Sequence, residues 1–88
     1  MARKDPVTAF VAAAVLQRDG GCVGPRVGMK GPCDGRLELD HILNGGMAWR
    51  GPSTIENLVS LCTRHHRIKT ENARWFRPLL IAWVDSHE

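Results

Sequence analysis

Three cysteines and one histidine are the first residues in this chain that could do chemistry together. Cys22 and Cys33 flank a glycine-rich stretch, and Cys62 is followed three positions later by His65. Thiolate and imidazole groups in a set of four suit tetrahedral zinc, although the gap between Cys22 and Cys33 exceeds the usual two to about four residues. We expect these four residues to bind one structural Zn²⁺. The alternative is that Cys22 and Cys33 are loop thiols and that Cys62 is a buried apolar residue.

Four further polar residues remain: Asp40, His41, Asn57 and His66. Asp40 and His41 end an otherwise apolar strand pattern, an unusual place for two adjacent ionisable groups. His66 directly follows His65, and neighbours on a helix point about 100° apart. The two histidines should therefore serve separate sites on either side of one helix. The opposite register, with His65 catalytic and His66 on zinc, stays open.

The types of these four residues indicate phosphodiester hydrolysis. Asp40 and His66 could hold a divalent ion (Mg²⁺, Mn²⁺, Ni²⁺ or Zn²⁺) and leave its other positions to water and phosphate oxygens. His41 could accept a proton from water near neutral pH, and Asn57 could tie down the loop that orients that imidazole. Taken alone, His41 would be interpreted as a surface or core histidine, and Asn57 as a turn residue. The occurrence of all four residues together favours a catalytic site.

The elements that must position these residues follow from periodicity and from Gly and Pro. Asp5 and Pro6 predict the start of a first helix, and Gly20 and Gly21 predict its end near Arg18. The alternation at 36–41 predicts a strand. We expect, in order, this first helix, a loop over 19–35, a strand at 36–41, a loop over 44–54, a strand at 58–61, a helix over 63–71, and a last helix that starts near 77 or 78.

Composition bounds the chain to one domain. It has 88 residues, a net charge of +3 and 43% hydrophobic residues. Hydrophobic cores of chains only slightly shorter than this are marginal, so a metal would add needed stability. An odd number of cysteines does not suit a disulfide framework. No apolar run approaches the ~20 residues of a membrane span, and we expect a cytoplasmic protein that binds no membrane.

Basic residues indicate a DNA partner. They concentrate in the segment from Arg64 to Arg77, which contains a single acid, Glu71. Contacts from such a segment to phosphates would be salt-dependent and largely independent of sequence. Arg50, in the loop between His41 and Asn57, could reach a phosphate as well. The residues expected to contact DNA are Arg64, Arg67, Lys69 and Arg50, with Arg74 and Arg77 in the same basic segment.

Three blocks of the sequence resemble the HNH endonuclease family: 37–42 (LELDHI), 56–62 (ENLVSLC) and 65–70 (HHRIKT). The resemblance covers roughly 18–70 and implies a ββα-metal fold of the α+β class, with a zinc-stabilised hairpin. In the family, the histidine that maps to His41 is the general base, and the residues that map to Asp40 and His66 bind the catalytic ion. Asn57 maps to the motif asparagine. The first zinc pair is stretched here, and His65 replaces the last cysteine of many members.

The resemblance implies a single HNH nuclease domain over 1–88. Its parts are an N-terminal arm and helix (1–18), the zinc loop and ββα-metal core (19–71) and a C-terminal helix (72–88). The layout is similar to small stand-alone HNH proteins of tailed phages and prophages, some of which act with terminase in DNA packaging. We therefore expect a DNA endonuclease in a bacterial or phage-infected cell, with terminase or another packaging protein as a possible partner. The alternative is a catalytically silent, zinc-stabilised DNA-binding or packaging-accessory module.

Overall fold

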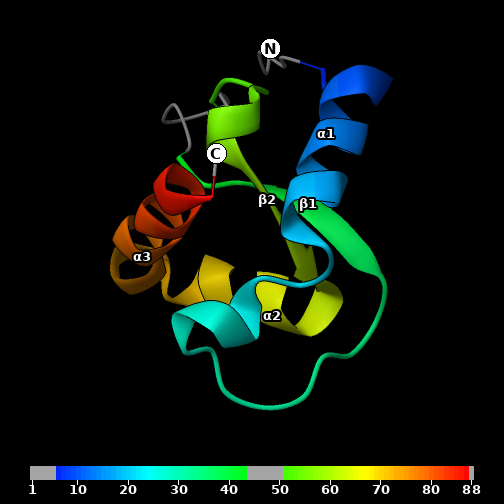
Figure 1. Ribbon diagram of the computed structural model, residues 1–88. Helices are drawn as coiled ribbons and strands as arrows, with labels where there is room; N and C mark the ends of the chain where they lie inside the picture. The colour runs from blue at the N-terminus through cyan, green and yellow to red at the C-terminus, as the bar shows by residue number, and fades with distance from the viewer. Residues whose placement is uncertain (1–5, 44–50, 88) are drawn as a thin grey trace, which may run out of the picture.

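The computed structural model describes residues 6–43 and 51–87 of the chain. It is a small α+β structure in which three helices surround one two-stranded antiparallel sheet, which confirms the predicted class (Figure 1). One short 3₁₀ turn (24–27) lies in the predicted loop over 19–35, and another (55–57) lies between the predicted loop over 44–54 and the predicted strand at 58–61. The elements are α1 (Ala9–Asp19), η1 (Gly24–Val27), β1 (Leu37–His41), η2 (Ile55–Asn57), β2 (Leu58–Cys62), α2 (Thr63–Glu71) and α3 (Ala73–Ser86).

The hairpin joins the two predicted catalytic blocks. β1 pairs with β2 so that Leu37 lies opposite Cys62 and His41 opposite Leu58. All five residues of β2 are buried, whereas β1 is partly exposed. The outer edge of β2 is also covered, because Ser60 donates its N–H to Asp19 Oδ2 (2.7 Å) and accepts from the Val23 N–H (2.9 Å). Such cover leaves no open edge for pairing with another chain at this point.

Helix α1 begins later than the sequence predicted. Its N-cap is Thr8, whose hydroxyl accepts the Val11 N–H, so the predicted start at Asp5 and Pro6 is wrong. Threonine is a favoured N-cap residue, and Thr8 directly precedes the first helical residue. The predicted stop is confirmed, since Gly20 adopts the left-handed conformation (φ 66°) that ends the helix. Phe10, in the first turn of this helix, is 79% exposed.

The C-terminal end of α1 is locked onto the start of β2. Arg18 pairs with Asp19 at 2.7 Å and donates to the carbonyls of Ile55 (2.7 Å) and Leu58 (2.6 Å). Both side chains of this pair are almost fully buried. Their hydrogen bonds fix η2, the turn that carries Asn57, against the helix.

Helix α3 begins at Ala73, earlier than predicted, and Pro78 lies inside it. The sequence prediction treated Pro78 as a start signal. Pro lacks an N–H and usually interrupts a helix, but burial of a stripe that includes Phe76 favours helix on both sides of it. Among the described residues, no helix combines the length and apolar character needed to cross a membrane. The core contains Val23, Met29, Ile42, Val59, Leu61, Phe76, Leu80, Trp83 and Val84.

Candidate functional site

The predicted cysteines and histidine come together beneath the first turn of α2. The Sγ atoms of Cys22, Cys33 and Cys62 lie 3.4, 3.7 and 3.2 Å from His65 Nδ1. All four ligand atoms lie within 4.8 Å of one another, so the cluster could hold a metal ion. This confirms that the long gap between Cys22 and Cys33 does not prevent the four residues from meeting.

His65 is oriented so that one ring nitrogen faces the thiols. Its Nε2 lies 3.2 Å from the Lys30 carbonyl and 3.1 Å from the Gly31 carbonyl. These acceptors favour a proton on Nε2 and leave the Nδ1 lone pair for an ion, an arrangement typical of metal-binding histidines. Gly24 packs so closely on the ring that a Cβ at that position would lie 2.6 Å from His65 Cγ. The loop therefore needs glycine there.

The thiols of the cluster do not ionise alike. Burial opposes ionisation of Cys62, but backbone N–H groups of His65 and Asp34 outweigh it and lower the pKa of Cys62 to about 7. Desolvation, followed by hydrogen bonding and charge from the neighbouring thiols, raises the pKa of Cys33 to about 11. Of Cys33 and Cys62, Cys62 is thus the thiol that more readily becomes a thiolate, the form that binds metals.

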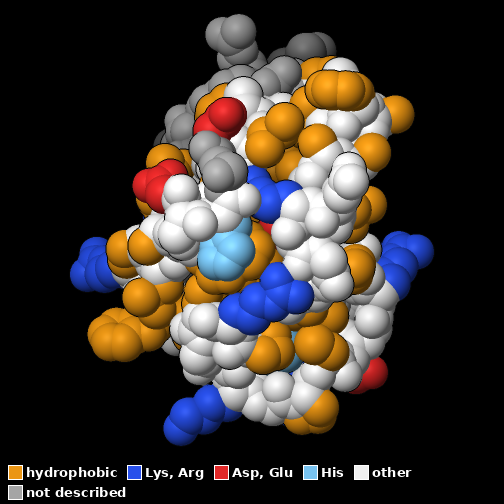
Figure 2. Space-filling view, in the orientation of Figure 1, with side chains coloured by type: hydrophobic (Ala, Val, Ile, Leu, Met, Phe, Trp, Pro, Cys, Tyr) orange, Lys and Arg blue, Asp and Glu red, His pale blue; other side chains and the backbone are white. Residues whose placement is uncertain are grey.

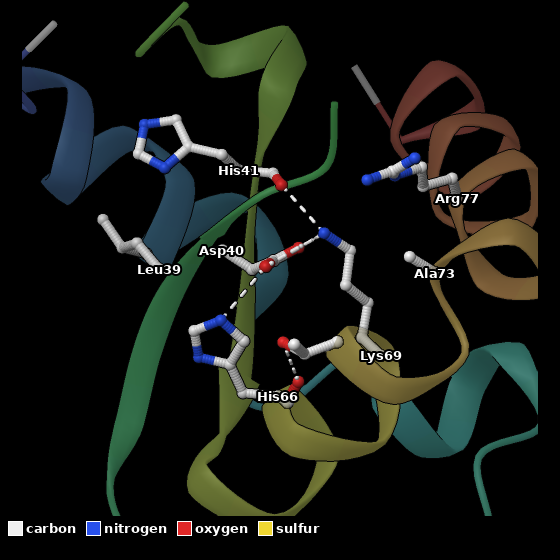
Figure 3. A pocket seen from close by; sticks show the side chains of 8 residues that line it. Leu39, Asp40, His41, His66, Lys69, Ala73 and Arg77 are labelled. Carbon is white, nitrogen blue, oxygen red and sulfur yellow. Dashed lines mark hydrogen bonds and ion pairs between the residues drawn. The ribbon is translucent and has the colours of Figure 1, made fainter. Parts of the chain in front are cut away.

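His66 serves the opposite side of α2, as the adjacent positions predicted. Its Nδ1 lies 2.7 Å from Glu38 Oε1, and its Nε2 lies 3.1 Å from Asp40 Oδ1. Figure 3 shows His66 rising from α2 toward Asp40 on β1. The structure therefore places His65 with the cysteines and His66 with the carboxylates, and the opposite register is wrong.

The two carboxylates hold a proton on His66. The hydrogen bond to Asp40 outweighs desolvation and, with the hydrogen bond to Glu38, raises the pKa of His66 to about 9. Hydrogen bonds from His66 and Thr63 lower the pKa of Glu38. At neutral pH His66 is an imidazolium between two carboxylates, so an ion that binds its Nε2 must displace a proton.

Lys69 does not lie on the exposed face of α2, where a surface contact to DNA was expected for it, but lines the pocket. The residue is 3% exposed, and its ammonium lies 3.0 Å from Asp40 Oδ2. It also donates to the His41 carbonyl at 2.9 Å (Figure 3). The physical reason is helical spacing, because Lys69 lies three residues after His66 and shares its face toward β1.

His41 and Asp40 leave the end of β1 in different directions. The imidazole of His41 projects away from Lys69, while the His41 carbonyl faces it (Figure 3). The ring Nε2 of His41 lies 2.9 Å from Ser53 Oγ. The structure thus brings Asp40 and His66 into direct contact and places the His41 ring on a separate side of the same strand end.

Asn57 fastens the segment that follows His41. Its Oδ1 accepts the Leu43 N–H at 2.9 Å. Its amide donates to the carbonyls of Leu43 (3.1 Å) and Pro52 (2.9 Å). One buried side chain therefore bridges the chain leaving β1 and the chain returning toward β2. Ties of this kind fix the backbone that carries the His41 ring.

A pocket of about 330 Å³ opens beside these groups. It is lined by residues of β1, α2 and α3, among them Asp40, His66, Lys69 and Arg77. The position of Arg77 was not predicted, because α3 lies outside the segment that resembles HNH proteins. The pocket gives the Asp40–His66 pair access to a ligand from outside.

The remaining predicted DNA contacts divide between exposed and undescribed positions. Arg64 and Arg67 are exposed on α2, and Arg74 is exposed on α3. Arg50 lies outside the described residues. On the face shown in Figure 2, Lys and Arg side chains are spaced apart, and apolar side chains gather over α1.

Glu38 and Ser53 are site residues that the sequence prediction missed. Glu38 lies two residues before Asp40, so the period of a strand puts both on one face. That signal was available from the sequence. Ser53 lies near His41 only because the hairpin closes, and no local pattern indicates it. Comparison of the chain with protein-family models, curated proteins and solved structures finds no match.

Proposed function

We propose that this protein is a metal-dependent DNA endonuclease with a zinc-stabilised ββα-metal core of the HNH type. The observation that carries the proposal is the pair formed by Asp40 Oδ1 and His66 Nε2, 3.1 Å apart beside an open pocket. Two adjacent ligands of an octahedral ion with bonds of about 2.1 Å lie about 3.0 Å apart. The donor pair therefore fits a divalent ion with most of its coordination positions left open.

The cluster of three cysteines and His65 supports a structural zinc on the other side of α2. Four ligands complete a tetrahedral shell, and a closed shell suits structure rather than catalysis. Binding energy at such a site becomes folding energy. In a chain of 88 residues, this contribution holds the loop over 19–35 and the first turn of α2 together.

Each residue of the second site has a distinct task in the proposed reaction. Asp40 and His66 hold the divalent ion, which when bound polarises the phosphate. As the oxygen of the attacking water bonds to phosphorus, His41 takes a proton from that water. The bond from phosphorus to the leaving sugar oxygen breaks, and that oxygen gains a proton from solvent. Asn57 positions the segment that carries His41.

The surroundings of His66 support its role as a ligand. Glu38 holds Nδ1 at 2.7 Å, which directs Nε2 toward Asp40. A carboxylate behind a metal-bound imidazole fixes the ring and raises its basicity. Exposed Arg64 and Arg67 lie on the same helix and contact DNA phosphates in this proposal, with Arg50 as a further contact.

Plasmid nicking tests the proposal directly. Zinc-loaded wild-type protein is incubated with supercoiled DNA and Mg²⁺, Mn²⁺, Ni²⁺ or Zn²⁺, beside His41→Ala. Loss of the general base should lower the rate about 10²–10⁴-fold while the binding of the catalytic ion survives. Wild-type protein that binds DNA but cleaves it with none of the ions would instead favour the accessory module. Such a module has no need of the Asp40–His66 pair.

A further inference from the structure

Of the cationic side chains that line the pocket, Arg77 is the one without a partner among the described residues. It comes from α3 and lines the same pocket as Asp40 and His66. Its side chain is half-buried, and its Nε is buried without a hydrogen-bond partner. Figure 3 shows its guanidinium pointing from α3 into the space beside Lys69 and the end of β1. No hydrogen bond or ion pair joins it to residues 6–43 or 51–87.

The other charged side chains that line this pocket all have partners. Lys69 pairs with Asp40 at 3.0 Å, and His66 lies between Asp40 and Glu38. Asp40, His66 and Lys69 are thus engaged with one another, whereas Arg77 has no such partner among the described residues. Leaving a buried N–H donor without an acceptor is costly, and so is a partly desolvated charge without a counter-charge. The pocket therefore favours an anion that can accept hydrogen bonds.

We propose that Arg77 makes this pocket a phosphate subsite and that its guanidinium contacts the non-bridging oxygens of the phosphodiester to be cleaved. A guanidinium presents paired N–H groups in a planar fork that matches two phosphate oxygens. It would meet the phosphate from α3, on the side of the pocket opposite an ion that Asp40 and His66 would hold from β1 and α2. Only the identity of that phosphate as the scissile group rests on the proposed nuclease function.

This contact would act most strongly in the transition state. As the water oxygen bonds to phosphorus and before the leaving oxygen departs, negative charge grows on the non-bridging oxygens. A fixed donor aimed at those oxygens stabilises the transition state more than the ground state. Arg77 is thereby distinct from exposed Arg74 on the same helix, which does not line the pocket. Removal of Arg74 should affect DNA binding alone.

The test measures binding of inorganic phosphate by zinc-loaded protein without added catalytic ion. The Arg77 Nε–Hε resonance in ¹⁵N NMR should shift saturably as phosphate is added. Arg77→Gln should weaken phosphate binding at least tenfold, Arg77→Lys should weaken it less, and Arg74→Gln should leave it within about twofold of wild type. Circular dichroism confirms that each variant is folded.

Cleavage of a duplex oligonucleotide gives the second measurement. Arg77→Gln should lower kcat about 10²–10³-fold, as loss of a transition-state donor does, whereas Arg74→Gln should change KM only. If phosphate binding depends on Arg77 but the wild-type protein cleaves no DNA, the proposed nuclease function is refuted and the proposed phosphate subsite is retained. An Arg77→Gln variant that is folded and keeps both wild-type phosphate affinity and wild-type kcat would overturn the subsite alone.

Discussion

Replacement of Lys69 by methionine isolates one charge at the centre of the second site. The ammonium lies 3.0 Å from Asp40 Oδ2 and donates to the His41 carbonyl at 2.9 Å. Methionine keeps most of the apolar stem in place and removes the charge and both interactions. The carboxylate of Asp40 is 5% exposed, so it stays largely desolvated after the partner is lost. The variant therefore leaves a buried carboxylate that depends on His66 alone.

The expected cost follows from that burial. Breaking a buried ion pair by removing one partner typically costs about 3–5 kcal/mol. His66 stays 3.1 Å from the other oxygen of Asp40 and carries its proton at pH 7, since its pKa is raised to about 9. This remaining charge offsets part of the loss. We expect Lys69→Met to lower the free energy of unfolding by about 2–3 kcal/mol, and the melting temperature by roughly 10–20 °C.

Urea unfolding at pH 7 in excess zinc measures this change while the metal cluster stays loaded. Arg67→Met is the matched control, because Arg67 is exposed on the same helix and its loss should cost under about 0.5 kcal/mol. Adding Asp40→Asn to Lys69→Met removes the orphaned charge and should recover at least about 1 kcal/mol. If Lys69→Met costs no more than Arg67→Met, the pair does not hold β1 to α2, and the reasoning fails.

Three further predictions concern the metal cluster, pH and the Asn57 tie. Purified protein should carry one zinc per chain, and chelation or Cys33→Ser should unfold it by circular dichroism; an unchanged melting curve after zinc removal would contradict this. The interactions that raise the pKa of His66 to about 9 stabilise the fold fully below pH 6.5. This contribution is lost as pH rises through about 9. The stability difference between wild type and His66→Gln in urea should therefore shrink by on the order of 2 kcal/mol from pH 6 to 9.5, and a difference that grows would refute the assignment. Asn57→Ala removes three hydrogen bonds and should cost about 1–3 kcal/mol in urea unfolding. Asn57→Ala should also slow plasmid nicking less than His41→Ala does. Equal losses of nicking rate in the two variants would contradict a positioning role for Asn57.

Local patterns in the sequence were sufficient for the hairpin and for α2. Alternation predicted a strand at 36–41, and the structure has Leu37–His41; the predicted helix over 63–71 coincides with Thr63–Glu71. The metal cluster could also be predicted, because ligand chemistry restricts which residues can share an ion. For the cluster the signal lies in residue types, and for the hairpin and α2 it lies in residue types and in spacing over a few positions. Such signals survive folding because neighbours along the chain keep their relation in space.

The wrong predictions involve competition between local signals and packing over long distances. Pro78 is a strong local signal, yet burial of Phe76 before it and Leu80 after it favours one continuous helix. Lys69 has the sequence context of a surface cation, but its partners Asp40 and His41 lie nearly thirty residues earlier. No local pattern distinguishes a lysine that meets a carboxylate across the fold from one that meets solvent.

The first turn of α2 makes the two sites dependent on each other. Cys62 caps this helix by accepting the His65 N–H, and it also contributes a thiol to the metal cluster. His65 turns inward to that cluster, so the adjacent His66 can only turn toward β1, where Glu38 and Asp40 receive it. An ion in the cluster would therefore fix the rotation of α2 about its axis, and that rotation determines where His66 Nε2 lies. In a chain this short, the same few residues that supply folding energy also set the geometry of the proposed chemistry.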